Sequence, residues 1–582
     1  MQSILKRLNY IFDNATLESF PELQDHQNFL TEITPSTQEK FGHYQYNSAM
    51  KLSKLLKIPP REIAERIIKN IDTNDLISNV EIAGPGFINI TLSKEYLAET
   101  VLYILDNLNL GIDLPINPQR IVIDFSSPNI AKELHVGHLR STIIGDSLAR
   151  LFEFLGHDVL RLNHIGDWGT SFGMLIAYLK EEEPEVLTGK KNTDLTHLVN
   201  WYKASKKRFD EDAEFKKRAQ AEVSVLQSGD PDALKAWKII CEISEKAYRE
   251  IYDLLNVKIN DRGESFYNPM LAGVIKDLEN KHILEISEGA KCVFLEGFVN
   301  REGEPLPMIV QKSDGGFNYA TTDMAAMKHR TQIELADRII ILTDAGQSSH
   351  FQMIAKAAEK VGYLDPKKVR FDHVTFGLVL SPDGTKFKTR SGDTEKLIDL
   401  LNTAVNKAEE ILNERSLEID EKEKKHLAKA LGISAIKYAD LSSNRIGDYT
   451  FSYDRMLRFE GNTAAYLMYS YVRIEGIKRR INQDIESLIK DTEIALNHPS
   501  EISLGLHLAR FQEVLDQIVE DLMPHRLTDY LYNLAEKFNA FFRDCRVEGA
   551  IEQNSRLLLC EAVSRTMKQG LDILGVETVK RM

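Results

Sequence analysis

The segment from residue 121 to 173 constrains the fold of this chain more than any other. An apolar run at 121–125 predicts a short buried strand, and a polar break follows it. Apolar residues at helical spacing then predict a helix from about Gly137, with Gly156 as its stop, and a second strand begins at Val159. This order predicts a right-handed βαβ unit, which places ligands at the carboxyl ends of its strands.

The turn between the first strand and the helix reads His135-Val136-Gly137-His138. Two imidazoles three residues apart can both face the space above the strand, and Gly137 lets a ligand approach the backbone. A helix N-terminus adds free N–H groups and partial positive charge, which suit phosphate. The alternatives are that this motif occurs by chance or that it forms one half of a metal site. No Cys, Asp or Glu lies nearby at the spacing of a zinc site, which argues against the metal.

A second polar loop, Asn163 to Gly169, follows one strand later. SPNIAKELHVGHLRSTIIGD followed by LNHIGDWGTSFG resembles the class I aminoacyl-tRNA synthetases, specifically the arginyl-tRNA synthetases, with HVGH in place of their HIGH signature. The resemblance covers almost the whole chain. It implies an α/β fold: a Rossmann-like parallel-sheet catalytic domain, a small α/β N-terminal domain and an all-helical C-terminal bundle. It also implies ATP contacts by His135, Gly137, His138, Gly166, Asp167, Trp168 and Gly169.

A basic loop between Gly384 and Gly392 reads KFKTR at its centre. Such a loop alone is usually a solvated turn, but together with HVGH it resembles the KMSKS element of class I enzymes. Lys386 matches the first lysine of that element, whereas Thr389 stands at the second. Arginyl-tRNA synthetases often show this loss together with a lysine shortly before HIGH. The resemblance thus gives catalytic roles to His135, His138 and Lys386, and it leaves the transition-state cation open among Lys132, Lys388 and Arg390.

A guanidinium substrate is best bound by carboxylates, which accept two parallel hydrogen bonds from it. Glu264 and Asp323 are the candidate acids, and Tyr319 lies one helical turn before Asp323, so one pocket could receive both. From the residues alone, an exposed Glu264 and a helix-capping Asp323 are the simpler interpretation. The resemblance instead assigns all three to the arginine pocket.

The resemblance also assigns the α-amino end of arginine to Asn129. Met353 stands where the family has a glutamine, with Gln352 beside it and Gln347 and His350 upstream, so that contact is unassigned. Gln347 is a candidate for binding arginine. The implied reaction is attack of the arginine carboxylate on the α-phosphorus of ATP, followed by transfer of arginine to the terminal adenosine ribose of tRNA(Arg). Mg²⁺ is expected with ATP, without a tightly bound metal or organic cofactor. Whether activation requires bound tRNA is left open.

The length of 582 residues predicts three or four domains. An aromatic and amide-rich cluster near residue 44 could stack on unpaired bases, although ordinary packing explains it equally well. Charged residues between about 180 and 260 predict solvated helices. The resemblance implies an N-terminal tRNA-contacting domain at 1–115, a catalytic domain at 116–400 with a helical insertion at 180–260, a helical connector at 401–455 and a helical anticodon-binding domain at 456–582. The tRNA-binding candidates are Tyr44, Gln45, Asn47 and Arg473.

The net charge of −14 argues mildly against a nucleic-acid partner, but phosphate binding needs only a local basic face. We find no signal peptide and no apolar run long enough to span a bilayer, and the four cysteines lack CxxC spacing. We therefore expect a cytoplasmic protein without membrane contact. We also expect a monomer, although the sequence leaves the oligomeric state open. A synthetase for another amino acid and a catalytically silent tRNA-binding protein are the alternatives. The acids Glu264 and Asp323 argue against the first, and His135, His138 and Lys386 argue against the second.

Overall fold

The computed structural model describes residues 3–25, 31–73, 75–191, 193–381, 383–385, 396–415 and 419–582. The chain divides into two compact units, which we call the central unit and the terminal unit. The central unit consists of Pro115–Leu457 and Ile573–Val576, and the terminal unit of Met1–Leu114, Arg458–Asp572 and Glu577–Met582.

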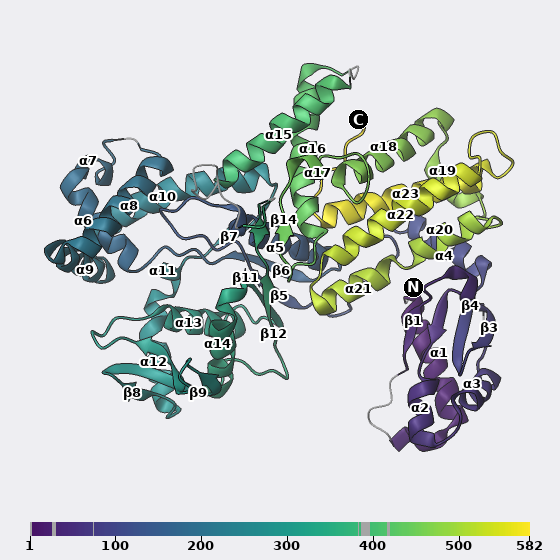
Figure 1. Cartoon of the computed structure of the whole chain (residues 1–582), viewed down its shortest axis with the longest axis horizontal. Coiled ribbons are helices and arrows are strands. Elements are labelled where there is room, and N and C mark those ends of the chain that lie inside the picture. The colour runs from purple at the N-terminus through teal and green to yellow at the C-terminus, as the bar shows by residue number, and fades with distance from the viewer. Residues whose placement is uncertain are drawn as a thin grey trace. The chain divides into compact units, whose positions relative to one another are not determined.

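A five-stranded parallel sheet forms the middle of the central unit (Figure 1). Its strand order is β12-β11-β5-β6-β7. Helix α5 (Val136–Phe154) connects β5 to β6 on one side, whereas β11 pairs with the other side of β5. The sheet therefore changes winding direction between β5 and β11, which is where α/β sheets bind ligands. The strands are β5 (Arg120–Asp124), β6 (Asp158–Asn163), β7 (Asn260–Asp261), β11 (Arg338–Asp344) and β12 (Arg370–Phe376).

Alternate residues of the parallel strands face opposite sides of the sheet, and both sides are covered. Val122 and Ile339 pack into a core with helices α13 (Tyr319–Gln332) and α14 (Ser348–Val361). Residues 121 and 123 are also fully buried. This burial on both sides explains why the strands read as unbroken apolar runs in the sequence.

A second, antiparallel sheet lies beside α13 and α14, and the sequence did not reveal it (Figure 1). Its order is β10-β9-β8, and the tight turn between β8 and β9 has positive φ at Glu288 and Gly289. That geometry is typical of a two-residue hairpin. The elements here are α11 (Glu264–Tyr267), α12 (Leu271–Asn280), β8 (Glu285–Ser287), β9 (Ala290–Val299) and β10 (Pro305–Gln311).

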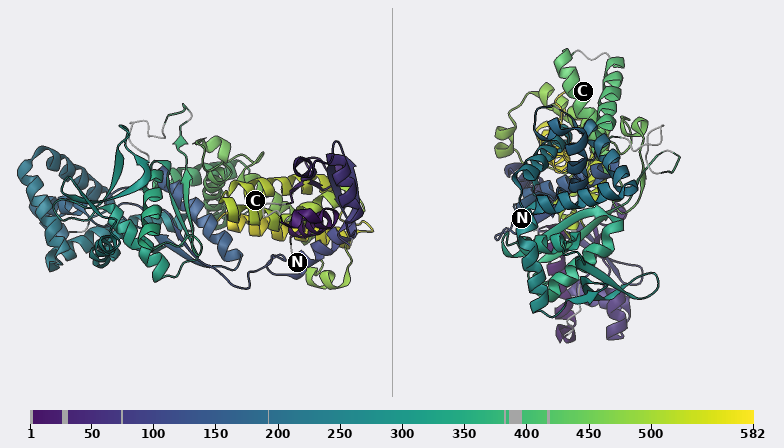
Figure 2. Two further views of the ribbon diagram at one scale, coloured as in Figure 1. Left: turned by 90° about the horizontal axis from the view of Figure 1, so that it is seen from below. Right: turned by 90° about the vertical axis from the view of Figure 1, so that its left-hand side faces the viewer.

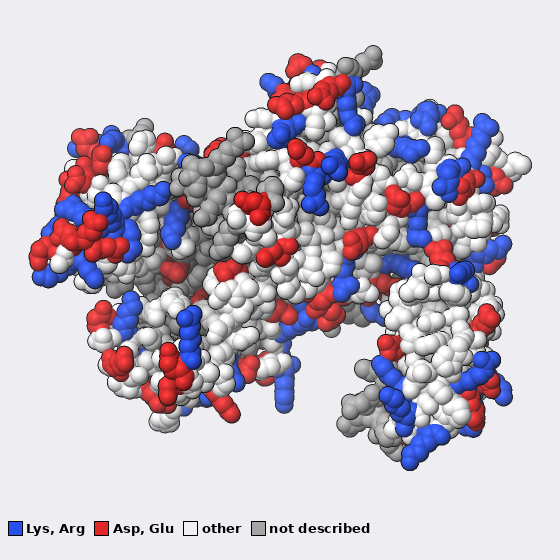
Figure 3. Space-filling view, in the orientation of Figure 1, with Lys and Arg blue, Asp and Glu red and all other residues white. Residues whose placement is uncertain are grey.

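Between β6 and β7 the structure describes five helices, from Thr170 to Leu254, where the sequence predicts a helical insertion at 180–260 (Figure 2). Lys, Arg, Asp and Glu are interspersed over its surface in Figure 3, and ion pairs such as Lys180–Glu222 at 2.7 Å join neighbouring helices. The charge run in the sequence is therefore a set of solvated helix faces. The helices are α6 (Thr170–Glu182), α7 (Pro184–Leu187), α8 (Leu195–Glu211), α9 (Ala213–Gln227) and α10 (Pro231–Leu254).

The edge of the sheet ends at Phe376, although the apolar residues 374–380 could be taken for a single strand. Strand β12 ends at Phe376, and the short β13 (Val379–Leu380) pairs instead with β14 (Tyr449–Thr450). Gly377 breaks the ladder, since its N–H donates to the Arg445 carbonyl at 2.8 Å and its carbonyl accepts from Arg140 at 2.7 Å.

A buried ion pair joins α5 to the helical connector. Arg140 and Asp440 lie 3.1 Å apart and both side chains are fully buried. Lys437 is also buried and donates to the carbonyls of Leu255 at 2.6 Å and Gly575 at 2.8 Å. The segment Ile573–Val576 thus returns to the central unit after the last helix of the chain. The connector consists of α15 (Leu397–Glu414), α16 (Glu421–Leu441) and α17 (Tyr453–Met456).

The terminal unit combines a small antiparallel sheet, of order β1-β2-β4-β3, with helices from both ends of the chain. No helix among the described residues has both the length and the apolar character that crossing a bilayer requires. The strands are β1 (Ile33–Pro35), β2 (Tyr44–Tyr46), β3 (Ile77–Ala83) and β4 (Phe87–Leu92), and the helices are α1 (Ile4–Ser19), α2 (Ala49–Leu56), α3 (Pro60–Lys69), α4 (Lys94–Asp106), α18 (Ala464–Ile481), α19 (Ile485–Asp491), α20 (Pro499–Ala509), α21 (Phe511–Asp521), α22 (His525–Asp544) and α23 (Gln553–Ile573).

Candidate active site

A cleft of about 960 Å³ opens at the carboxyl ends of β5 and β11. This is the point where the winding of the sheet changes, as expected for a ligand site. The walls come from the loops after β5, β6 and β11, from α13 and from residues 376–379. The predicted site residues that line it are Asn129, His135, Gly137, His138, Gly166, Glu264, Tyr319, Asp323 and Gln347.

The two imidazoles at the start of α5 are held by the backbone of their own turn. The Gly137 N–H donates to Nδ1 of His135 at 3.1 Å, and the His135 N–H donates to Nδ1 of His138 at 3.1 Å. A nitrogen that accepts a hydrogen bond carries no proton, so each neutral ring has its proton on Nε2. Each histidine therefore has one N–H left to donate to a ligand.

Both imidazoles have lowered pKa values, although only His138 is half-buried and His135 is exposed. Burial, followed by the charges of His135 and Lys132, lowers the pKa of His138 to about 3. Burial and Lys132 also lower the pKa of His135. Neutral imidazoles can donate to phosphoryl oxygens over the whole physiological pH range without a proton equilibrium of their own.

The loop after β5 is held in an unusual backbone conformation that the sequence does not signal. Ser126, Ser127 and Ala131 have φ values of 68°, 49° and 59°, although none is glycine. Buried side chains fix their N–H groups: Ser126 donates to Ser141 Oγ and Ser127 to Asn163 Oδ1, both at 2.9 Å. Such strained backbone persists only where its surroundings over-determine it, and it concentrates at functional sites.

Two carboxyl groups, those of Glu264 and Asp323, also line the cleft; we call this part its acidic end and the part with His135 and His138 its imidazole end. Burial, then the neighbouring charges of Asp323 and Asp167, raises the pKa of Glu264 to about 8. Asp323 lies 2.6 Å from Nε2 of His350, and the ring of Tyr319 is 5.0 Å from the His350 ring. The simpler interpretation of the acids is wrong, because Glu264 is half-buried and Asn318, rather than Asp323, caps α13. Nothing in the sequence indicates His350 as the partner of Asp323.

Asn129 is supported by close contact with Gly166. The two residues form a parallel backbone bridge, and a Cβ on Gly166 would lie 2.3 Å from Asn129 Oδ1. Gln347 is exposed and donates to Asp344 at 3.0 Å. Met353 is buried in the core behind the cleft, so its position offers no polar contact to a ligand there.

The predicted ATP contacts Asp167, Trp168 and Gly169 are not among the residues that line the cleft. Both carboxylate oxygens of Asp167 already accept hydrogen bonds from Ser265. The ring of Trp168 lies 6.1 Å from that of Trp237 on the insertion helix α10. Each carboxylate oxygen of Asp167 therefore already has one donor within the protein, and the predicted contact between Asp167 and ATP stays a prediction.

The candidate cations differ in how far the structure describes them. Lys132 is exposed near the Tyr202 ring and outside the walls of the cleft, although its charge acts on both imidazoles. Lys386, Lys388 and Arg390 lie outside the described residues. The described chain on either side of them lies at the cleft, because Val379 lines it and Lys396 forms a backbone bridge with His135.

The terminal unit corrects the prediction for Tyr44, which is fully buried and offers no surface to RNA. Its hydroxyl donates to Glu513 at 2.7 Å and accepts from Arg510 at 3.3 Å, so it joins β2 to α21. Gln45 and Asn47 are half-buried, and each donates to a neighbouring strand, to Asn89 at 2.8 Å and to Thr34 at 3.0 Å respectively.

Arg473 lies on the exposed side of α18. Its guanidinium is 4.5 Å from the centre of the Phe542 ring and donates to Asn539 at 3.3 Å. The neighbouring Tyr469 is also exposed. A cation beside exposed aromatic rings is typical of surfaces that bind single-stranded nucleic acid.

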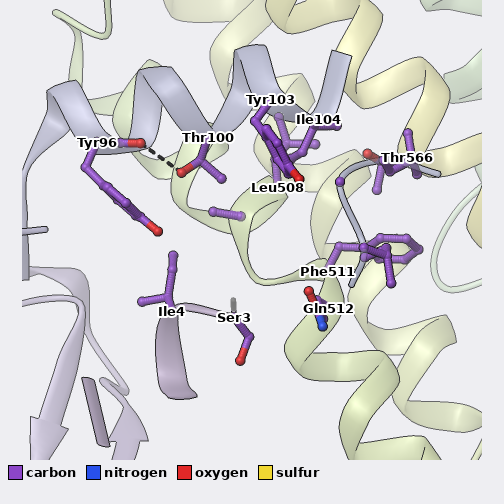
Figure 4. Close-up of a pocket in the computed structure, with 14 residues that line it drawn as sticks. Ser3, Ile4, Tyr96, Thr100, Tyr103, Ile104, Leu508, Phe511, Gln512 and Thr566 are labelled. Carbon is purple, nitrogen blue, oxygen red and sulfur yellow. Dashed lines mark hydrogen bonds between the residues drawn. The ribbon is translucent and has the colours of Figure 1, made fainter. Parts of the chain in front are cut away.

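Figure 4 shows a much smaller cavity in the terminal unit, of about 30 Å³. Tyr103, Leu508 and Phe511 contribute to its walls, and the Thr100 hydroxyl beside it donates to the Tyr96 carbonyl. It has room for roughly one or two water molecules. It cannot hold a nucleotide or an amino acid, whereas the cleft of the central unit has room for both.

The described cleft can accommodate two kinds of ligand group. The imidazole N–H donors and the helix start suit an anion, and the carboxyl pair suits a planar cation. Across the described ranges, no three His, Cys, Asp or Glu side chains are grouped as ligands of a metal ion.

Three family models match successive parts of the chain. Residues 4–92 match the arginyl tRNA synthetase N-terminal domain, 100–453 match the catalytic domain of class I (R) tRNA synthetases, and 467–582 match the DALR anticodon binding domain. These matches follow the order in which the chain builds its N-terminal sheet, parallel sheet and C-terminal helices.

Relatives and solved structures agree with the family models over the full length. The chain is 64% identical to an arginine–tRNA ligase of Protochlamydia amoebophila and 51% identical to one of Trichodesmium erythraeum, in each case over 100% of both chains. The crystal structure of an arginyl-tRNA synthetase from Plasmodium falciparum is similar with a TM-score of 0.87, 35% identity and full coverage of both chains. One from Thermus thermophilus shares the fold, with a TM-score of 0.80 at 21% identity, and covers 99% of this chain and 100% of its own.

Proposed function

This chain belongs to the arginyl-tRNA synthetase family and is a class I arginine–tRNA ligase, and we propose that the cleft of the central unit is where it activates arginine. The enzyme uses ATP to attach arginine to tRNA(Arg). One observation carries the assignment of the site: the same cleft is lined by imidazole donors and by two carboxyl groups.

Glu264 and Asp323 bind the guanidinium of arginine in this proposal. A planar guanidinium offers parallel N–H donors to carboxylates. Tyr319, at the first turn of α13, lies over the same end of the cleft, and Asn129 and Gln347 offer amide groups for the α-amino end. The buried setting, in which Glu264 has a raised pKa, favours a ligand that brings its own positive charge.

His135, His138 and the start of α5 bind the phosphates of ATP. The arginine carboxylate attacks the α-phosphorus in line, a new carboxyl–phosphorus bond forms, and the bond to the β-phosphate oxygen breaks to release pyrophosphate. Nε2–H donors and free N–H groups aimed at this region stabilise the charge that develops on the phosphoryl oxygens. The protein thus supplies position and electrostatics rather than a covalent intermediate.

Lys132 and the cations of the loop at 386–390 add positive charge for the departing pyrophosphate. The positions of Val379 and Lys396 support this role for the loop between them, as does the effect of Lys132 on both imidazoles. Lys132→Ala, Lys386→Ala, Lys388→Ala and Arg390→Ala, compared in pyrophosphate exchange, rank the cations by their loss of rate. Mg²⁺ enters with ATP and is held largely by its phosphates.

We further propose that Gln45, Asn47 and Arg473 contact tRNA, and that the N-terminal and C-terminal domains at 1–115 and 456–582 bring them to it. The family models for an N-terminal domain and an anticodon binding domain support these roles. A monomeric state and a cytoplasmic location stay predictions, which sedimentation and cell fractionation test.

Amino-acid-dependent exchange of pyrophosphate into ATP tests the proposed site most directly. The wild-type enzyme is expected to respond to arginine and not to lysine or citrulline, measured with and without tRNA. A Glu264→Gln variant that discriminated arginine from neutral citrulline as well as the wild type does would contradict the assignment of the acidic end.

A further inference from the structure

We propose that Asp167 is a positioning residue for arginine recognition, because its carboxylate holds the turn at 263–265 and so sets the place of the Glu264 carboxylate in the cleft. This inference rests on the proposed role of Glu264 in binding the guanidinium. It assigns to Asp167 a task different from the ATP contact that its motif implied.

Two hydrogen bonds connect Asp167 to the turn. The Ser265 N–H donates to Oδ1 at 2.8 Å, and the Ser265 hydroxyl donates to Oδ2 at 2.6 Å. In addition, the Glu264 N–H donates to the Ile165 carbonyl at 2.9 Å. Hydrogen bonds to the loop that carries Asp167 therefore hold the backbone at Glu264 and at the next residue, which fixes the position of the Glu264 Cα.

Close packing in the same place excludes other arrangements of the turn. A Cβ on Gly263 would lie 2.1 to 2.4 Å from the carboxyl atoms of Asp167, so only glycine fits beside it. The turn is thus pressed directly against the carboxylate. We call these contacts between Asp167 and residues 263–265 the clamp. Because they are tightly packed, the position of Asp167 determines the position of Glu264, the residue that follows Gly263.

The insertion helix α10 holds the other side of Asp167. The indole N–H of Trp237 donates to the Asp167 carbonyl at 2.7 Å, and the Trp168 ring packs against Trp237. The clamp therefore runs from α10 through Asp167 to the turn. Asp167 also acts on Glu264 through its charge, which adds to burial and Asp323 in raising the pKa of Glu264.

Asp167→Ala and Ser265→Ala test the clamp, with KM for arginine and KM for ATP measured separately in pyrophosphate exchange. We expect Asp167→Ala to raise KM for arginine about tenfold or more, the factor that corresponds to roughly 1.4 kcal/mol, with KM for ATP changed less than about twofold. Ser265→Ala keeps the backbone N–H and loses only the hydroxyl, so its increase should be about two- to fivefold. Asp158→Ala is the matched control, because this exposed acid lies at the opposite end of β6.

A double-mutant cycle separates positioning from a purely structural loss. In a Glu264→Gln background, Asp167→Ala should add less than about twofold to KM for arginine, because the group that it positions has lost its charge. Selection of arginine over citrulline should fall in Asp167→Ala as it does in Glu264→Gln. An additive effect, or a rise in KM for ATP as large as that for arginine, would overturn the proposal.

The outcomes also distinguish this proposal from the assignment on which it rests. If Glu264→Gln left KM for arginine unchanged, the arginine-binding role of Glu264 would fail, and the clamp would have no consequence for recognition. If Glu264→Gln impaired arginine use while Asp167→Ala and Ser265→Ala did not, only the clamp would be overturned. Should Asp167→Ala fail to fold, Ser265→Ala decides alone: an unchanged KM for arginine in that variant overturns the clamp.

Discussion

The two ends of the cleft use opposite chemistry but share one property. At one end, His135 and His138 present N–H donors at the start of α5, and at the other, Glu264 and Asp323 present carboxyl groups. Burial lowers the pKa of both histidines and raises that of Glu264 to about 8. Near neutral pH the imidazoles are uncharged and Glu264 is largely protonated.

The two ends differ in whether ligand binding changes the protonation state of the protein. A phosphate accepts from neutral imidazoles as they stand, so the first end needs no proton transfer to bind. A guanidinium at the second end favours the ionised carboxylate, so its binding removes a proton from Glu264. One end of the cleft is therefore expected to be insensitive to pH, whereas the other is sensitive to it.

The largest effect should come from the imidazole end. His138→Ala removes an N–H donor aimed at developing charge, and removal of one such donor typically costs about 10²- to 10³-fold in rate. We expect the rate of adenylation, measured by pyrophosphate exchange, to fall by that factor. The affinity for tRNA should change by less than about twofold. His157→Ala, outside the cleft, is the control, and equal losses in the two variants would contradict the assignment.

The acidic end should show a different kinetic signature. Asp323→Ala removes one of the two carboxyl groups, and loss of a charge-assisted hydrogen bond costs about 1.5–3 kcal/mol. KM for arginine should rise by a factor of about 10 to 100, with KM for ATP little changed, as measured by varying each substrate in turn. A rise confined to KM for ATP would mean that the two ends have been assigned in reverse.

The pH dependence should sharpen the contrast. Because Glu264 is protonated below its pKa of about 8, KM for arginine should fall as pH rises from 6 toward 8, by at most about tenfold per unit, and then level off. His138, whose pKa is lowered to about 3, should contribute no change over this range. Calorimetry in buffers of different ionisation enthalpy should detect the release of about one proton with arginine at pH 7. A flat profile in the wild type would contradict a protonated Glu264, and Glu264→Gln should remove the slope.

The smallest effect on activity should come from outside the cleft. Tyr44→Phe removes a buried hydroxyl bonded to Glu513, which should destabilise the terminal unit by about 1–2 kcal/mol, seen as a lower midpoint of thermal unfolding. Aminoacylation rates should stay within about twofold of the wild type. Tyr10→Phe, at an exposed position, should change neither quantity. A specific loss of tRNA affinity in Tyr44→Phe would restore the original prediction for this residue.

The parallel sheet and the site around HVGH could be predicted because local sequence carries both. The strand β5 is a buried apolar run, and the helix start follows directly from the break after it. The family resemblance then selected Glu264 and Asp323, whose positions along the chain give no hint that they face the same cleft.

Other features could not be predicted because they depend on contacts between distant segments. The burial of Tyr44 depends on Glu513 and Arg510, more than 460 positions away. The role of Asp167 depends on a turn about 100 residues later, and the end of β12 depends on Arg140 and Arg445. Aromatic and acidic residues look alike in a sequence whether their partners are solvent, ligand or protein.

The return of Ile573–Val576 to the central unit has a practical consequence for dissecting this enzyme. A recombinant fragment ending at Leu457 would contain every described wall of the cleft, yet it would remove the Gly575 carbonyl from the buried ammonium of Lys437. Such a fragment would expose one side of α16, the helix whose Asp440 pairs with Arg140 of α5. Weak activity in such a truncated protein would therefore reflect a destabilised central unit rather than the absence of anticodon recognition. A test of the catalytic part alone must supply Ile573–Val576, either in trans or by circular permutation.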